Sequence, residues 1–129
     1  MKKKIKRFVP PLLVMLILAN TMAYAGNQLY SFDLPTGAAR YTDVITKDTS
    51  NTSAKIYRSG PSGTTSTIRF TVVNPDTITK STTDTIKGIG NISLTYIGAN
   101  KSDLLRLKVQ NYAPDNSGAS TSASGRWEP

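Results

Sequence analysis

The residue types that most enzymes use for catalysis are scarce in this chain. It has no His and no Cys among its 129 residues, which excludes histidine-based triads, cysteine nucleophiles and most zinc sites. No Lys follows a Ser by three places, so a serine–lysine dyad of the S-x-x-K type is absent. Gly60-Pro61-Ser62-Gly63 is one residue too short for a nucleophile elbow and is typical of a turn. We therefore predict a protein that is not an enzyme and that needs no cofactor.

Paired carboxylates are the remaining chemical alternative, since two Asp or Glu side chains can hydrolyse glycosides. Asp115-Asn116-Ser117-Gly118 resembles part of a calcium loop but lacks the further acidic ligands and the closing Glu, so we predict no metal site. The aspartates nearly all fall in or beside expected turns, where Asp hydrogen-bonds its own backbone: Asp43, Asp48, Asp76, Asp84, Asp103 and Asp115. A carboxylate-pair enzyme stays a minor alternative.

Four basic residues occupy outward positions of expected strands: Arg69, Arg106, Lys108 and Arg126. If those strands are neighbours, the four cations form one basic face that could bind an anionic cell-wall polymer or a membrane surface through phosphate contacts. The alternative is an ordinary solvated face. Tyr57, Tyr112 and Trp127 could likewise form a sugar-stacking platform, although aromatic residues in strands more often belong to the core.

The elements that must position these residues begin after a leader, residues 1–25. Its basic head is followed by an apolar run at residues 8–19, and Ala23-Tyr24-Ala25 fits the A-x-A cleavage pattern. This order predicts a signal-peptide helix that engages the secretion machinery, a signal peptidase cut between Ala25 and Gly26, and a secreted, extracellular protein. An uncleaved membrane anchor is the alternative, but it needs about 20 apolar residues, and the run is shorter and contains two prolines.

Removal of the leader changes the charge of the protein. The whole chain carries a net charge of +8, but five of its sixteen basic residues and none of its eight acidic residues lie in the leader. Residues 26–129 therefore carry a net charge of +3, which is ordinary for a small domain, so we expect no nucleic-acid partner. These 104 residues suffice for a single secreted domain that folds without disulfides.

Hydrophobic alternation with period two marks most of this domain as β-strand. Ser and Thr make up 29 of the 104 residues and suit exposed sheet faces, and no window after the leader shows helical periodicity. We expect an all-β fold: one antiparallel β-sandwich or jelly-roll-like domain of six to eight short strands. The expected strands cover residues 28–34, 40–47, 54–58, 65–73, 77–87, 91–97 and 103–112, with a final short strand carrying Trp127.

Two of these expectations concern pairing. Residues 91–97 and 103–112 are separated by a five-residue, turn-rich segment, so we predict that they form a hairpin. Residues 77–87 are rich in Thr and carry Lys80 and Asp84, which favours an edge strand because such side chains discourage pairing with another sheet.

Three short stretches carry a family resemblance: the closing Ser124-Gly125-Arg126-Trp127-Glu128-Pro129, the leader end at residues 23–27, and Ser31-Phe32-Asp33-Leu34-Pro35. In these the chain resembles a family of small secreted Gram-positive proteins, known as a domain of unknown function, that has a Gly-x-Trp near the C-terminus. A looser likeness links the chain to lactococcin-like bacteriocins, which are also small, cysteine-free and all-β, although their His- and Gly-rich tracts are missing here. We therefore expect a non-enzymatic binding protein at the cell envelope or in the medium. The alternative is a bacteriocin-like toxin or an associated factor.

Overall fold

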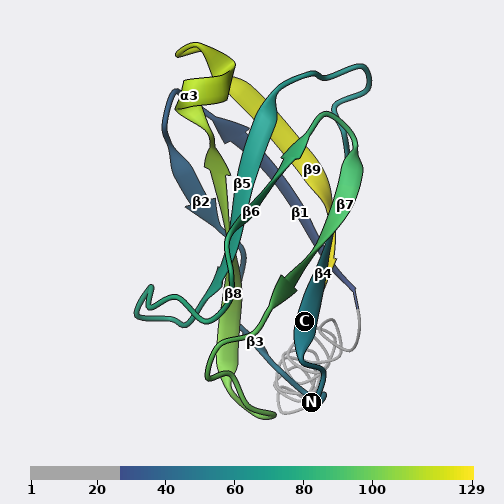
Figure 1. The fold of residues 1–129 in the computed structure, drawn as a ribbon, viewed down its shortest axis with the longest axis vertical. Helices are drawn as coiled ribbons and strands as arrows, with labels where there is room; N and C mark the ends of the chain where they lie inside the picture. Colours follow the sequence, from purple (N-terminus) through teal and green to yellow (C-terminus); the bar gives the residue numbers. More distant parts are fainter. Residues whose placement is uncertain (1–26) are drawn as a thin grey trace, which may run out of the picture.

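The computed structural model describes residues 27–129 and confirms an all-β sandwich of two antiparallel sheets (Figure 1). The predicted signal peptide and its cleavage residues, Ala23, Ala25 and Gly26, lie outside the described residues. The described elements are β1 (Gln28–Leu34), β2 (Ala39–Tyr41), β3 (Ile45–Thr46), β4 (Ser53–Gly60), β5 (Thr67–Val73), β6 (Asp84–Lys87), β7 (Gly90–Thr95), β8 (Leu104–Asn111), the helix α3 (Ala113–Asn116) and β9 (Thr121–Glu128).

One sheet has the strand order β1-β9-β4-β7, and the other has the order β2-β8-β5-β6, with β3 also paired to β8. Figure 1 shows the C-terminal strand β9, in yellow, running beside β1, while α3 lies at the end of the molecule where β8 leads into β9. Two of the nine strands are only two or three residues long, which accounts for the excess over the predicted six to eight.

The core follows from the alternation seen in the sequence. Strands with period two place every second side chain on one face, and in β1, β5 and β8 that face is buried between the sheets. Trp127 of β9 is fully buried in the same cluster. The other buried members from these strands are Tyr30, Leu34, Ile68, Phe70, Val72, Leu105, Leu107 and Val109, as the period-two alternation of their sequences predicts.

The predicted hairpin is wrong. β7 pairs with β4, with Ile92 opposite Ile56, whereas β8 pairs with β5 in the other sheet, with Val109 opposite Phe70. The segment between β7 and β8 therefore crosses from one sheet to the other. Its end is fixed to the residue after β3, because Lys47 N–H donates to the Asp103 carbonyl at 2.8 Å and Ser102 N–H donates to the Lys47 carbonyl at 2.6 Å.

The strand expected at residues 77–87 is shorter than predicted, because only Asp84–Lys87 forms one, β6. It does lie at the edge of its sheet, as expected. Side chains replace the ladder before it: Asn74 Oδ1 accepts from Ile78 N–H, and Ser81 Oγ accepts from Val72 N–H, both at 2.9 Å. Such local side-chain bonds compete with sheet pairing in segments rich in Ser, Thr and Asn.

Residues 40–47, expected as one strand, are divided between β2 and β3. Thr42 interrupts the run by bonding β8 twice: its N–H donates to the Leu107 carbonyl at 3.0 Å, and its Oγ1 accepts from Leu107 N–H at 2.9 Å. The predicted turn after Tyr112 contains the four-residue helix α3. The final strand β9 has eight residues and pairs with both β1 and β4, so it is an interior strand of its sheet.

Candidate functional site: the basic face of β5 and β8

Three of the four predicted surface cations lie on the outer face of one sheet. β5 and β8 are hydrogen-bonded neighbours, and their register sets Arg69 opposite Gln110, Thr71 opposite Lys108 and Val73 opposite Arg106. Opposite residues of an antiparallel pair point to the same side. That side faces away from the core, because the alternate residues Phe70 and Val109 are buried between the sheets. We call Arg69, Arg106 and Lys108 the basic face.

Tyrosine rings hold two of these cations. The guanidinium carbon of Arg106 lies 4.5 Å from the ring centroid of Tyr41, and that of Arg69 lies 4.4 Å from the ring centroid of Tyr112. A cation–π contact of this kind contributes about 0.5 to 1 kcal/mol at an exposed site. It orients the plane of each guanidinium. The Nε of Arg106 is buried, so the Nη end of that guanidinium is the part that suits bonds to phosphate or carboxylate oxygens.

The three cations follow the direction of the strands. Arg106 and Lys108 are two residues apart on β8, a distance of about 7 Å along a strand. Arg69 lies one step further along, on the neighbouring strand, opposite Gln110. Arg106 is also anchored at the sheet surface, because its Nη2 donates to the Pro75 carbonyl at 3.0 Å. The basic face is therefore a short line of charge with two of its members held in place.

No acidic residue interrupts this line. The sequences of β2, β5 and β8 contain neither Asp nor Glu, and the salt bridge that the described residues form is on the other sheet. The positive potential of the basic face is thus not cancelled by a carboxylate on its own strands. A surface of this kind attracts polyanions at low ionic strength, where charges act over about 10 Å or more.

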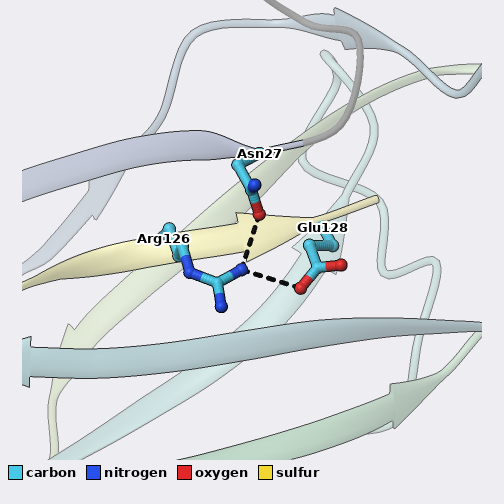
Figure 2. A network of polar contacts seen from close by, with 3 residues as sticks. All are labelled: Asn27, Arg126 and Glu128. Atoms are coloured by element: carbon cyan, nitrogen blue, oxygen red, sulfur yellow. Dashed lines mark hydrogen bonds and ion pairs between the residues drawn. The ribbon is translucent and has the colours of Figure 1, made fainter.

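Arg126, the fourth predicted cation, does not join this face. It lies on β9 in the other sheet, and its guanidinium stacks 3.7 Å from the ring centroid of Tyr57. Its Nη1 donates to Asn27 Oδ1 at 2.6 Å and to Glu128 Oε2 at 2.8 Å (Figure 2). The expectation of one face with four cations is therefore wrong, because the strand order places Arg126 in a different sheet and an ion pair already satisfies it.

The alternative of an aromatic platform is not supported, and Trp127 belongs to the core, as is more common for aromatic residues in strands. Tyr57 lies on β4 against Arg126, and Tyr112, the residue after β8, lies against Arg69. The three residues therefore share no surface on which a sugar could stack.

Sequence reasoning missed Lys87. In β6 it stands opposite Thr67 of β5, two positions before Arg69, and its side chain is exposed. Ile86 is buried, so the same alternation that identified the other cations would have indicated an outward Lys87. It adds a positive charge at the margin of the basic face.

Two further cations are buried and so cannot take part in a surface site. Arg58 is 1 % exposed and Lys47 is 1 % exposed. Burial lowers the pKa of both groups from their ordinary values, because removal from water disfavours the charged form. Lys47 Nζ donates to the Thr49 carbonyl at 2.5 Å and lies 4.8 Å from the ring centroid of Tyr96.

Protein oxygens surround the guanidinium of Arg58 in place of a carboxylate. Its three nitrogens donate to the carbonyls of Gly60, Ser66 and Ser122 and to the hydroxyls of Thr64 and Ser66. Its role is therefore structural, because the side chain connects the end of β4 with the loop before β5 and with β9.

Other kinds of site find no support in the part of the chain that the structure describes. Residues 27–129 contain no group of three or more acidic side chains placed to hold a metal ion. Among the same residues, no helix is long and apolar enough to cross a membrane.

No protein-family model matches the chain, and no curated protein matches it. Among solved structures, it is similar to a chain described as "Crystal structure of PirA", with a TM-score of 0.49 and 14 % sequence identity over 79 % of this chain and 91 % of that chain. Neither the fold nor a function of this chain rests on that likeness.

Proposed function

We propose that this chain is a secreted, non-enzymatic binding protein whose basic face holds an anionic polymer of the cell envelope. One observation carries the proposal: Arg69, Arg106 and Lys108 share one sheet face, two of them are oriented by tyrosine rings, and the strands beneath them carry no acidic residue. A line of cations on strands without acidic residues is suited to repeated phosphate groups, since an arginine can donate two parallel hydrogen bonds to one phosphate. Arg106 would make such a contact through its Nη1, because its Nε is buried and its Nη2 donates to the Pro75 carbonyl.

Export supports the choice of partner. The leader predicts delivery outside the cell, where the polymers of a Gram-positive wall are rich in phosphate or carboxylate groups. The low net charge of residues 26–129 favours a local binding face over general polycation behaviour. Nucleic acid is not expected as a partner.

The test is co-sedimentation or calorimetry with a poly(glycerol phosphate) wall polymer, and with neutral dextran as the reference polymer. The wild-type protein should bind the phosphate polymer and not dextran. If three contacts behave as they do on single-stranded nucleic acid, raising salt from about 50 to 200 mM weakens binding by about 20-fold. Absence of retention at low salt would sink the proposal.

A matched pair of triple variants separates local binding from overall charge. Arg69→Gln/Arg106→Gln/Lys108→Gln removes the basic face, and Lys55→Gln/Lys101→Gln/Arg126→Gln removes the same net charge elsewhere. Lys55 and Lys101 are exposed, and Arg126 is on the other sheet. The first variant should lose binding while the second keeps most of it. Equal losses would mean that net charge, and not this face, is responsible.

A further inference from the structure

The geometry points to a second copy of this chain as the partner of the β1 edge, forming a two-fold dimer in which two β1 strands pair antiparallel around Ser31. The inference does not depend on the proposed polymer binding, because β1 belongs to the sheet opposite the basic face.

β1 is a long strand at the end of its sheet. Its seven residues pair with β9 in an unbroken register from Gln28 opposite Trp127 to Leu34 opposite Thr121, and β9 is its neighbour in the sheet order. Natural edge strands are usually guarded by lysine, proline, a bulge or shortness. β1 contains no Lys and no Pro, and its register shows no bulge.

The other sheet ends within the described residues are protected. β2 has three residues, and β6 has four, with Asp84 and Lys87 at its two ends. The segment before β6 covers β7: Thr82 N–H donates to the Thr95 carbonyl at 2.8 Å, and Thr95 N–H donates to Thr82 Oγ1 at 3.0 Å. Protection of three ends and not of the fourth favours β1 as a place for strand addition.

The surface beside β1 has room for the side chains of an added strand. A groove of about 220 Å³ lies along the β1 and β2 edges, lined by residues 28–32 and 41–43. Phe32 borders it and packs against the core while remaining partly exposed. Side chains on the inner side of an added strand would extend over this groove and cover the ring of Phe32.

The sequence of β1 is compatible with pairing to itself. With two Ser31 residues facing each other across the axis, the Phe32 residues of the two copies are diagonal neighbours on the inner side, within reach of each other's rings. Tyr30 takes no part in this contact, because its ring is buried and its hydroxyl donates to the Tyr57 carbonyl across β9. The single charge of the strand, Asp33, lies opposite Leu29. The two Asp33 residues are four positions apart along the paired strands, about 14 Å, where salt screens their repulsion.

Cysteine substitution tests the register directly, because the chain has no cysteine of its own. Directly opposite residues have Cβ atoms about 5 Å apart, near the separation that a disulfide spans. Ser31→Cys in protein exported and processed from the full sequence should therefore form a covalent dimer on mild oxidation. Leu29→Cys is the matched control: position 29 is more exposed, at 81 %, but its two copies are about 14 Å apart. Equal crosslinking of both variants would overturn the register.

Charge substitution tests the dimer without crosslinking. By sedimentation velocity, the wild-type protein should show concentration-dependent dimers, whereas Ser31→Lys and Ser31→Asp should each be monomeric, because like charges meet at the axis. An equimolar mixture of the two variants should restore dimers. Ser93→Lys, an exposed position on β7, is the control and should dimerise as the wild type does. A wild type that stays monomeric at every concentration, or a mixture that fails to dimerise, overturns the inference.

Discussion

Gly125 occupies a position where two neighbouring strands bring large side chains together, and we expect Gly125→Ala to be strongly destabilising. It lies on the interior strand β9, opposite Tyr30 of β1 and Arg58 of β4. The phenol of Tyr30 passes over it to donate to the Tyr57 carbonyl at 2.8 Å. A Cβ on residue 125 would overlap that carbonyl oxygen and lie 2.8 Å from the Tyr30 hydroxyl oxygen.

The magnitude follows from two losses. Moving the Tyr30 hydroxyl off the Tyr57 carbonyl removes a hydrogen bond with a net contribution of about 0.5 to 1.5 kcal/mol. Inserting a methyl group against the backbone of β4 adds an overpacking cost of about 1 to 3 kcal/mol. We therefore expect the free energy of unfolding to fall by about 2 to 4 kcal/mol, which lowers Tm by about 10 to 25 °C for a domain of this size.

Urea unfolding followed by circular dichroism measures this loss, with Ser124→Ala as the neighbouring control on the outer side of β9. The control should change stability by less than about 0.5 kcal/mol. In a Tyr30→Phe background the hydroxyl is already gone, so Gly125→Ala should cost about 0.5 to 1.5 kcal/mol less than in the wild type. A loss below about 1 kcal/mol in the wild type, or strict additivity with Tyr30→Phe, would refute this account of Gly125.

Two further predictions concern buried polar groups. Arg58→Met removes the side-chain donors to the carbonyls of Gly60, Ser66 and Ser122, although Gly88 N–H still donates to the Ser66 carbonyl. Hydrogen bonds from a charged group contribute about 1.5 to 3 kcal/mol each, and their loss is partly offset because no cation is then desolvated. We expect a net loss of about 2 to 4 kcal/mol in urea unfolding, and wild-type stability would show that the offset is complete. Tyr96→Phe should cost little or stabilise at pH 7, because the buried Tyr96 hydroxyl has no hydrogen-bond partner. Burial raises the pKa of Tyr30 and of Tyr96 in the folded state, so the unfolded chain loses these protons first and stability should fall as pH rises above about 10. The lowered pKa of Lys47 has the opposite effect, so that its contribution to stability rises with pH below about pH 10.5. Tyr96→Phe should reduce the loss of stability at alkaline pH, which urea titrations between about pH 9 and 11 measure. An unchanged dependence of stability on pH would contradict the assignment of this loss to Tyr96.

Alternation predicted which side chains form the core but not which strands are neighbours. In β1, β5 and β8 the apolar positions recur at every second residue, and a strand with one buried face must place them inward. That requirement is the same whether the neighbour is next in sequence or far away. The predicted 91–112 hairpin failed for this reason: β7 and β8 each turn their apolar face to the same core, but from opposite sheets.

The basic face was predictable in part for the same reason. Outward positions for Arg69, Arg106, Lys108 and Arg126 follow from alternation, but their grouping needs the strand order. β5 and β8 are paired with Phe70 opposite Val109 and Val72 opposite Leu107 on their inner faces, whereas Ile68 stands opposite the buried Asn111. Arg126 is separated from them because Trp127 fills the core from the other sheet.

For Arg58, the alternation of β4 predicts a buried side chain, whereas its charge predicts an exposed one. Ala54, Ile56 and Arg58 all point inward on β4, so the pattern places an arginine in the interior, against the usual preference of charged residues for water. The residue of β9 directly opposite Arg58 is Gly125, which leaves room for the long side chain. The Ser- and Gly-rich sequence of β9, which resembles a low-complexity tail, gives the side chains of Arg58 and Tyr30 room to cross an interior strand.

The need for small residues where side chains cross β9 also explains the closing residues of the chain. Gly125 is small because Tyr30 crosses it, Arg126 faces out to stack on Tyr57, and Trp127 is fully buried in the core. In this chain the Gly-x-Trp pattern is therefore explained by the packing of β9 between β1 and β4. The residues that we expect to determine binding are on β5 and β8, where the side chains are set by outward exposure and not by packing. We therefore expect substitutions at positions 69, 106 and 108 to change binding without changing the fold.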